Sequence, residues 1–227
     1  MKFIMKNQRL LKKLLTIKTT FFWALKDIDL TIYKGEKIGI FGPNGSGKTT
    51  LLKLITGVTD PSDGSIILNG RVVSIIDLEA GFHLDLNGAQ NIMLNGLILG
   101  MSRREVEEKF HSIVEYSDIK RFIDVPLFTY SQGMLMRLSM SIALYARPDI
   151  LIIDENFGVG DQDFRNKFYK SIRSKEMKTT TFIFVSHFRE ILKKFCSTFY
   201  LIQNSSLTKI HSKDLLSIEY GKNSFLI

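Results

Sequence analysis

The chain has 227 residues, of which 44% are hydrophobic and 24% charged. This is close to the composition of ordinary globular proteins, which excludes disordered and fibrous classes. No apolar run approaches the ~18–20 residues that a membrane-spanning helix needs, so we expect no such helix. The basic N-terminus lacks the apolar segment of a secretory signal, which predicts a cytoplasmic location. The single cysteine, Cys196, excludes an internal disulfide, and we expect it to be a small buried side chain.

The formal net charge is +8, from 31 basic and 23 acidic residues. Such a balance can favour nucleic acid or an anionic membrane surface. The basic residues are scattered, apart from the neighbourhood of Lys12 and Lys13 and the pair Arg103 and Arg104. Aromatic side chains do not alternate with them as stacking platforms would. We therefore expect a solvated basic surface and no nucleic-acid partner.

Strands and helices alternate along the first third of the chain. A short buried strand is expected at residues 37–41, followed by a glycine-rich turn and a helix at 49–55. Turn residues at 60–64 precede two further expected strands, at 65–68 and 72–76. The alternation indicates an α/β fold built on a mostly parallel sheet.

The middle of the chain changes to helical periodicity and the last third returns to strands. Ser102 and Glu105 form the pattern of a capping box, which predicts a helix running towards Tyr116. A second helix is predicted by apolar residues four apart, with core packing as their role: Met134, Leu138 and Ile142. Apolar runs then predict strands at 150–153, 181–185, 199–203 and 206–210, the last two joined by a turn at 204–206.

A phosphate-binding loop is predicted at residues 42–49, which match the pattern G-x-x-x-x-G-K-[ST]. Its glycines let backbone N–H groups turn towards anionic oxygens, and the following helix adds the positive end of its dipole. Lys48 is expected to bridge the outer phosphates, and the Thr49 hydroxyl to ligate Mg²⁺. The expected nucleotide-binding residues here are Gly42, Pro43, Asn44, Gly45, Ser46, Gly47, Lys48, Thr49 and Thr50.

An acidic pair follows the predicted strand at 150–153. Asp154, at its carboxyl end, is expected to hold Mg²⁺ through water, as the second acidic element of nucleotide hydrolases does. Glu155 is placed to orient or deprotonate an attacking water. Because acidic residues commonly follow apolar runs, this pair indicates a nucleotide-hydrolysing site only in combination with the phosphate-binding loop.

Taken together, the motifs resemble those of the ATP-binding subunits of ABC transporters. Residues 130–134, Tyr-Ser-Gln-Gly-Met, stand where that family carries its LSGGQ signature, at the start of a predicted helix. Asp161 resembles the D-loop aspartate and His187 the switch histidine. The resemblance implies that His187 senses or holds the γ-phosphate, and that nucleotide is also contacted by Asp161, Ser131, Gln132 and Gly133.

The resemblance narrows to one branch of the family. Residues 81–110 and 123–134 resemble ATPases that export O-antigen, capsule or teichoic-acid polysaccharides. The resemblance implies a single nucleotide-binding domain with an ATPase core at 21–87 and 148–227, a helical subdomain at 88–147 and a basic tail at 1–20. It also implies ATP and Mg²⁺ as cofactors, a separate integral-membrane permease near residues 81–100, and a place on the cytoplasmic face of the inner membrane.

The implied mechanism uses two copies of the chain. They sandwich two ATP molecules, with the Lys48 loop of one copy facing Ser131 and Gly133 of the other. ATP binding closes this homodimer, hydrolysis assisted by Glu155 reopens it, and the permease converts the motion into export.

The sequence departs from the family pattern in three places. Asp77 stands where many members carry the Q-loop glutamine and is our third candidate Mg²⁺ ligand. Gln132 replaces the small residue that usually follows the second signature residue, here Ser131. Relatives normally begin with an additional strand and an aromatic side chain that stacks on adenine. Only 22 residues precede Trp23 here, so we expect that strand to be missing. The candidates for adenine contact, with core packing as their alternative role, are Phe21, Phe22 and Trp23.

Three other functions remain open at this point. A catalytically impaired or regulatory subunit would explain Asp77 and the short N-terminus, whereas the set Lys48, Asp154, Glu155 and His187 favours hydrolysis. A soluble ABC ATPase acting on ribosomes or DNA usually carries two cassettes or long coiled coils, and neither pattern occurs here. A small-molecule kinase would share the phosphate-binding loop but would not need the signature residues or His187.

Overall fold

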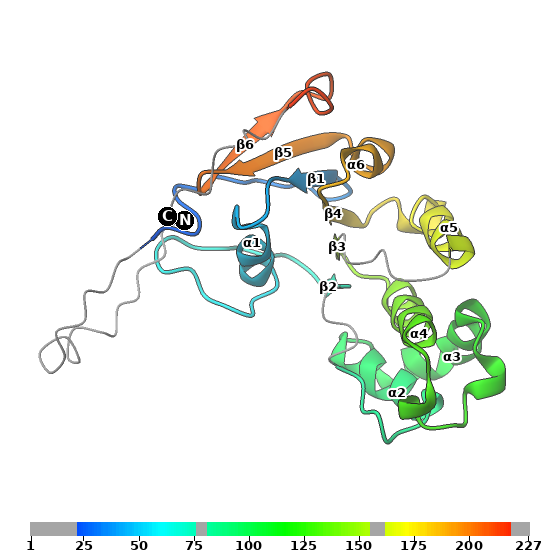
Figure 1. Ribbon diagram of the computed structural model, residues 1–227. Helices are drawn as coiled ribbons and strands as arrows, with labels where there is room; N and C mark the ends of the chain where they lie inside the picture. Colours follow the sequence, from blue (N-terminus) through cyan, green and yellow to red (C-terminus); the bar gives the residue numbers. More distant parts are fainter. Residues whose placement is uncertain (1–21, 76–80, 155–161, 219–227) are drawn as a thin grey trace, which may run out of the picture. The chain divides into compact units, whose positions relative to one another are not determined.

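The computed structural model describes residues 22–75, 81–154 and 162–218 (Figure 1). The chain forms two compact units. Unit 1 comprises residues 1–32, 37–68 and 184–227, and unit 2 comprises residues 33–36 and 69–183. Hydrogen bonds join the strands in the order β2-β3-β4-β1-β5-β6. Within the described part of the chain, no helix is long and apolar enough to cross a bilayer.

Unit 1 is built on β1 (Lys37–Phe41), β5 (Thr198–Gln203) and β6 (Ser206–Ile210). β1 and β5 are parallel, with Ile38 opposite Thr198 and Phe41 opposite Leu201. β5 and β6 form an antiparallel hairpin whose turn residues Asn204 and Ser205 have φ angles of 50° and 64°. Two positive φ angles are typical of the tight turns that match the twist of a hairpin. The expected strands and their turn are thus confirmed.

Two helices complete unit 1: α1 (Lys48–Ile55) and α6 (Arg189–Phe195). Apolar residues of α1 and of the strands are almost fully buried, as expected for parallel strands covered by helices. They include Leu51, Leu52, Leu54, Ile38, Ile40, Phe41, Phe199 and Ile202.

Unit 2 contains three long helices: α2 (Gly88–Ile98), α3 (Arg103–Ser117) and α4 (Gln132–Tyr145). Its other elements are β2 (Val72–Ser74), β3 (Ile150–Asp154) and α5 (Gln162–Ser171), with the 3₁₀ turns η4 (Lys120–Phe122), η5 (Leu127–Thr129) and η7 (Lys175–Met177). β2 and β3 are parallel neighbours. β4 (Thr181–Val185) begins in unit 2 and ends in unit 1.

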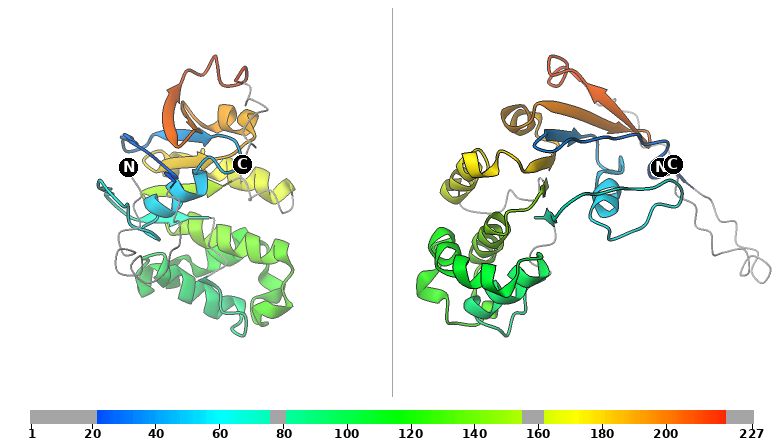
Figure 2. Two further views of the ribbon diagram at one scale, coloured as in Figure 1. Left: turned by 60° about the vertical axis from the view of Figure 1, so that its left-hand side comes forward. Right: turned by 180° about the vertical axis from the view of Figure 1, so that it is seen from behind.

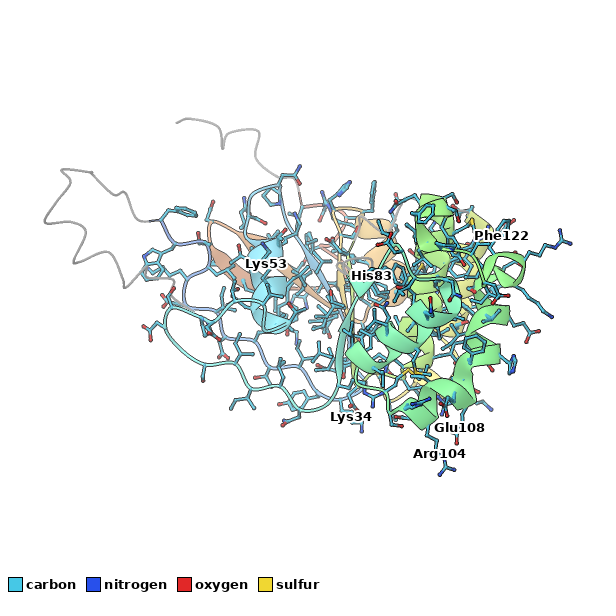
Figure 3. All side chains as sticks on the ribbon, turned by 90° about the horizontal axis from the view of Figure 1, so that it is seen from below. Lys34, Lys53, His83, Arg104, Glu108 and Phe122 are labelled. Atoms are coloured by element: carbon cyan, nitrogen blue, oxygen red, sulfur yellow. The ribbon has the colours of Figure 1, made fainter. Side chains whose placement is uncertain are left out.

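The ends of α2 and α3 follow local sequence signals. Ser102 caps α3 as expected: its hydroxyl accepts from Glu105 N, and Glu105 Oε2 accepts from Ser102 N at 2.6 Å. Asn87 and Gln90 form the same reciprocal capping box at α2. On the exposed face of α3, Arg104 pairs with Glu108, as Figure 3 shows. Because this pair is solvated, it contributes little stability, and the caps matter more.

The three helices share one hydrophobic core, which lies in the green part of the ribbon (Figure 2). The predicted stripe on α4 belongs to it, since Leu138 is fully buried and Ile142 is 1% exposed, with Met134 packed at the edge. All three helices lie within the range 88–147 expected to be helical. The division into an ATPase core and a helical subdomain at those boundaries remains a prediction.

One expected strand is wrong. Residues 65–68 have no regular secondary structure, and the following strand, β2, is shorter than the expected range 72–76 in the part that the structure describes. The side chains of Ile67 and Leu68 are 82% and 40% exposed. An apolar alternation stabilises a strand only when one face is buried against a core, and that burial is missing here.

The thiol of Cys196 is predicted to react slowly. The residue is half-buried, and its Sγ would lie 3.3 Å from a Cβ added to Gly39. Burial raises the pKa of the Cys196 thiol, and Lys37 opposes this shift only in part. Since the thiolate is the reactive form, native protein should react with Ellman's reagent at least about tenfold more slowly than urea-unfolded protein. Cys196→Ser provides the blank, and equal rates in the two states would contradict the prediction.

Candidate functional site

The loop between β1 and α1 is shaped by a close approach of β5. A Cβ added to Gly42 would lie 2.2 Å from the carbonyl oxygen of Ile202 and 2.9 Å from Ser46 Oγ. Gly47 has a φ angle of 105°, and its Cβ would lie 2.7 Å from the carbonyl oxygen of Ala24. Both positions therefore need glycine, one for space and one for space and backbone conformation. Close contacts within unit 1 thus explain why the loop has glycine at these two positions.

Two polar side chains converge on the loop. Lys48 Nζ donates to the carbonyl oxygens of Gly42 and Pro43, at 2.8 and 3.1 Å. The hydroxyl oxygen of Ser46 is buried and has no hydrogen-bond partner among the described residues. A buried polar atom without a partner is rare in proteins, and at this place it fits an anionic ligand that the hydroxyl would contact. The loop thus offers a cation and a hydroxyl at one point.

The first turn of α1 adds further donors. Its N-cap is Gly47, no side chain caps it, and its first turn contains no acidic residue. The helix therefore presents its backbone N–H groups and positive dipole end at the loop, an arrangement that favours phosphate. Thr49 is exposed and Thr50 is half-buried on this turn. The residues present fit a bound phosphate chain, with Thr49 able to offer a hydroxyl to Mg²⁺.

His187 lies at the same edge of the sheet as the loop. Phe182 N donates to Glu36 O, and four residues later Ser186 N donates to Ile40 O at 3.1 Å, so β4 runs parallel to β1. Ser186 and the phosphate-binding loop therefore follow the carboxyl ends of neighbouring strands. Within unit 1 the structure brings together the two predicted elements, the loop and His187. The histidine is exposed, and its catalytic role remains a prediction.

The other described candidates belong to unit 2. Asp154 is the last residue of β3 and is half-buried. Ser131 is the N-cap of α4, with its hydroxyl accepting from Met134 N at 3.3 Å, and Gln132 begins the helix. Among the described residues, the atom nearest to a Cβ added to Gly133 would be Ser131 Oγ, at 3.9 Å. Packing within the described part of the chain therefore does not require glycine at position 133.

Three predicted residues lie outside the described part of the chain: Asp77, Glu155 and Asp161. Phe21 also lies outside it. Of the other aromatic candidates for adenine contact, Phe22 is 82% exposed and Trp23 is half-buried. The Trp23 carbonyl accepts a hydrogen bond from the Ser205 hydroxyl in the β5–β6 turn. Assignment of an adenine-stacking side chain remains a prediction.

Two positioning residues were missed by the sequence reasoning. Asn91 is fully buried on α2; its amide oxygen accepts from His83 N, and its amide nitrogen donates to the carbonyl oxygens of His83, Leu86 and Asn87. The Tyr130 hydroxyl donates to Phe122 O at 2.5 Å, and burial, followed by the charge of Asp124, raises the pKa of Tyr130 to about 12. The tyrosine therefore stays protonated and anchors the loop before the signature helix. An asparagine among the apolar residues of a predicted helix could have indicated that Asn91 is buried and hydrogen-bonded.

Substituting alanine for two of these glycines should have different effects on the stability of the protein. Gly42→Ala should destabilise the protein by at least about 2 kcal/mol, because its methyl group meets backbone that cannot move cheaply. Gly133→Ala should leave the free energy of unfolding unchanged or raise it by up to about 1 kcal/mol, because alanine favours the helix and has open space. Urea denaturation of both variants and the wild type measures this. Equal stability of the two variants would contradict the steric argument.

The comparisons with known proteins point to one family. The family model described as ABC transporter matches residues 25–158. The O-antigen export system ATP-binding protein of Klebsiella pneumoniae is 41% identical over 198 residues, which cover 87% of this chain and 80% of that protein. The protein of the same name from Myxococcus xanthus is 42% identical over 87% of this chain and 45% of its own length. A teichoic acids export ATP-binding protein from Enterococcus faecalis is 44% identical over 79% of this chain and 40% of its own length.

Solved structures agree on the fold. An ATP-binding subunit of an ABC transporter superposes with a TM-score of 0.77 at 21% identity, over 87% of each chain. A dimeric ATP-binding cassette in a post-hydrolysis state with ADP and Pi superposes with a TM-score of 0.71 at 19% identity, over 86% of this chain and 94% of that one. The expected α/β nucleotide-hydrolase fold is thereby confirmed. The chain spans 45% and 80% of the lengths of the two O-antigen relatives. From the matched residues, the identity with these relatives and the shared fold, the chain belongs to the ABC transporter family and has the fold of its ATP-binding cassettes.

Proposed function

We propose that this chain binds and hydrolyses ATP and thereby powers export of a cell-surface polysaccharide through a separate integral-membrane permease. The polysaccharide would be of the O-antigen, capsule or teichoic-acid type, in keeping with the names of the relatives. The observation that carries the ATP-binding step is the loop before α1, where Lys48 donates to the Gly42 carbonyl and the buried Ser46 hydroxyl has no partner among the described residues. The chain would lie on the cytoplasmic face of the inner membrane.

Phosphate binding would use groups already present at the loop. Lys48 Nζ would exchange its two loop carbonyls for outer phosphate oxygens, a change that replaces neutral acceptors with charged ones. Ser46 Oγ and the first N–H groups of α1 would supply further donors. Thr49, Asp154 and Asp77 would hold Mg²⁺, which when bound neutralises phosphate charge. Pro43, Asn44, Gly45 and Thr50 would shape the remainder of this site.

The proposed hydrolysis places two residues around the γ-phosphate. Glu155 follows Asp154 directly and would orient or deprotonate the attacking water. His187 would contact the γ-phosphate from the carboxyl end of β4, the strand beside β1. These roles require precise placement of groups rather than covalent chemistry, as is general for phosphoryl transfer.

A second copy of the chain would complete the site. Ser131, Gln132 and Gly133 lie at the start of α4, and among the described residues only Ser131 Oγ, at 3.9 Å, would lie near a Cβ added to Gly133. Glycine that packing does not need fits a surface that a nucleotide from another copy approaches closely. The N–H groups and dipole of α4 would then face the γ-phosphate, and Asp161 would also contact the nucleotide. The proposal is therefore an ATP-sandwich homodimer.

Lys48→Ala should reduce ATP hydrolysis by at least about 100-fold, because the variant loses the cation that balances phosphate charge. Lys53→Ala is the matched control. It removes an exposed cation from the other end of α1 (Figure 3) and should leave turnover within about twofold of wild type. Steady-state phosphate release from the purified variants measures both effects, and undiminished turnover in Lys48→Ala would overturn the phosphate assignment.

The same pair of variants tests the export step in cells. Cells that carry Lys48→Ala as their sole copy should lose the surface polysaccharide and accumulate it internally, whereas cells with Lys53→Ala should not. Sugar-specific staining of intact and lysed cells distinguishes the two pools. Normal surface polysaccharide together with absent ATP hydrolysis would overturn the export function and leave the ATPase assignment standing.

Glu155→Gln should trap an ATP-dependent dimer. The variant should still bind nucleotide, but it lacks the base for the hydrolysis step that would reopen the dimer. Light scattering of the purified variant with and without Mg-ATP measures the shift from monomer to dimer. Adding Ser131→Arg should prevent closure by steric and charge conflict at α4, while nucleotide affinity of the monomer stays nearly unchanged. A dimer unaffected by Ser131→Arg would refute the position of the signature residues in the interface. A persistent Glu155→Gln monomer that binds ATP would favour an impaired or regulatory subunit.

A further inference from the structure

The first residue of α6 binds the C-terminal turn of unit 1. Arg189 Nη1 donates to the carbonyl oxygens of Leu215, at 3.1 Å, and of Leu216 and Ile218. The turn, residues 211–218, lies beside α6 after β6 (red in Figures 1 and 2). One guanidinium nitrogen thus donates to three carbonyl groups of this turn.

The turn is itself firmly attached to the unit. Leu215 is fully buried, and Asp214 N donates to His211 O at 3.0 Å. Ser217 N and Ile218 N both donate to Asp214 O, at 3.2 Å. This local structure orients three carbonyl groups towards one cation, an arrangement that charge-assisted hydrogen bonds stabilise. Arg189 therefore joins α6 to a turn that is anchored by its own hydrogen bonds and by buried Leu215.

The residues just before Arg189 are attached to β1 through Ser186. Ser186 N donates to Ile40 O at 3.1 Å, and Phe188 N donates to Ser186 Oγ at 2.9 Å. The ring of His187 packs on that of Phe188, with centroids 3.8 Å apart. His187 is thus held between two fixed residues, Ser186 at the end of β4 and Arg189 at the start of α6.

We propose that Arg189 is a positioning residue for His187, acting through the contact between α6 and the C-terminal turn. The inference rests on the proposed function, in which His187 contacts the γ-phosphate. Because Ile40 lies two residues before Gly42, the upstream attachment fixes the segment relative to the phosphate-binding loop of the same unit. The downstream attachment, through Arg189, then sets the direction in which the exposed histidine points. Removing it should loosen His187 without disturbing the loop.

The test is a double-mutant cycle on ATP hydrolysis. Arg189→Met keeps much of the side-chain length and removes the cation. It should lower kcat by about 10- to 100-fold and change the KM for ATP by less than about twofold, because misplacement of a group acting in the transition state affects kcat first. Arg189→Lys should recover part of the loss. In a His187→Ala background, Arg189→Met should have less than about a twofold further effect.

Lys193→Met is the matched control, since it removes an exposed cation from the last turn of the same helix and should leave kcat unchanged. Thermal denaturation confirms that each variant folds; if Arg189→Met does not, Arg189→Gln goes through the same cycle. An unchanged kcat, or an equal reduction in both backgrounds, would overturn the positioning role. Absence of hydrolysis in the wild type would instead overturn the proposed function, and is seen before any variant is compared.

Discussion

The approach of the β5 backbone to Gly42 is the constraint on which the candidate site depends. β1 and β5 pair in parallel with Phe41 opposite Leu201, so the chain leaving β1 passes directly beside Ile202. Any side chain at position 42 would collide with that carbonyl group. The chain turns there, Lys48 folds its ammonium group back over the loop, and the Ser46 hydroxyl is buried with no hydrogen-bond partner in the part of the chain that the structure describes. Strand pairing in the sheet therefore determines where the phosphate-binding donors converge.

In unit 2, buried polar side chains fix the local conformation. Asn91 satisfies its amide entirely on the backbone of residues 83–87, and Tyr130 uses its hydroxyl on η4. Such groups are costly to bury unless every donor and acceptor is paired, and once paired they specify one conformation. The start of α4 is thus presented on a rigid support. In the proposed homodimer, this start of α4 would meet a nucleotide held by the other copy of the chain.

The proposed cycle of dimer closure and opening depends on these locally fixed groups. Closure of two copies requires phosphate-binding groups that are already oriented, because ordering them on binding would reduce affinity. In unit 1, the loop and His187 are attached to adjacent parallel strands, and Arg189 adds a second attachment through the C-terminal turn. Both attachments would hold the segment of His187 in place for the contact with the γ-phosphate that the proposed function assigns to it.

The sequence by itself determined what depends on local chemistry. The capping box at Ser102, the stripe on α4 and the β5–β6 turn follow from capping, period-specific apolar and turn residues, and the structure has all of them. The glycine-rich turn between β1 and α1 also follows from local sequence, and its binding of phosphate stays a prediction. The strand expected at residues 65–68 failed because its apolar side chains have no core to face. Tertiary structure alone decided the steric need for Gly42, the burial of the Ser46 hydroxyl and of Asn91, and the contact of Arg189 with residues 215–218. Gly42 and Arg189 meet residues distant in the chain through backbone carbonyl groups, which are alike in every sequence, so only folding shows which of them meet.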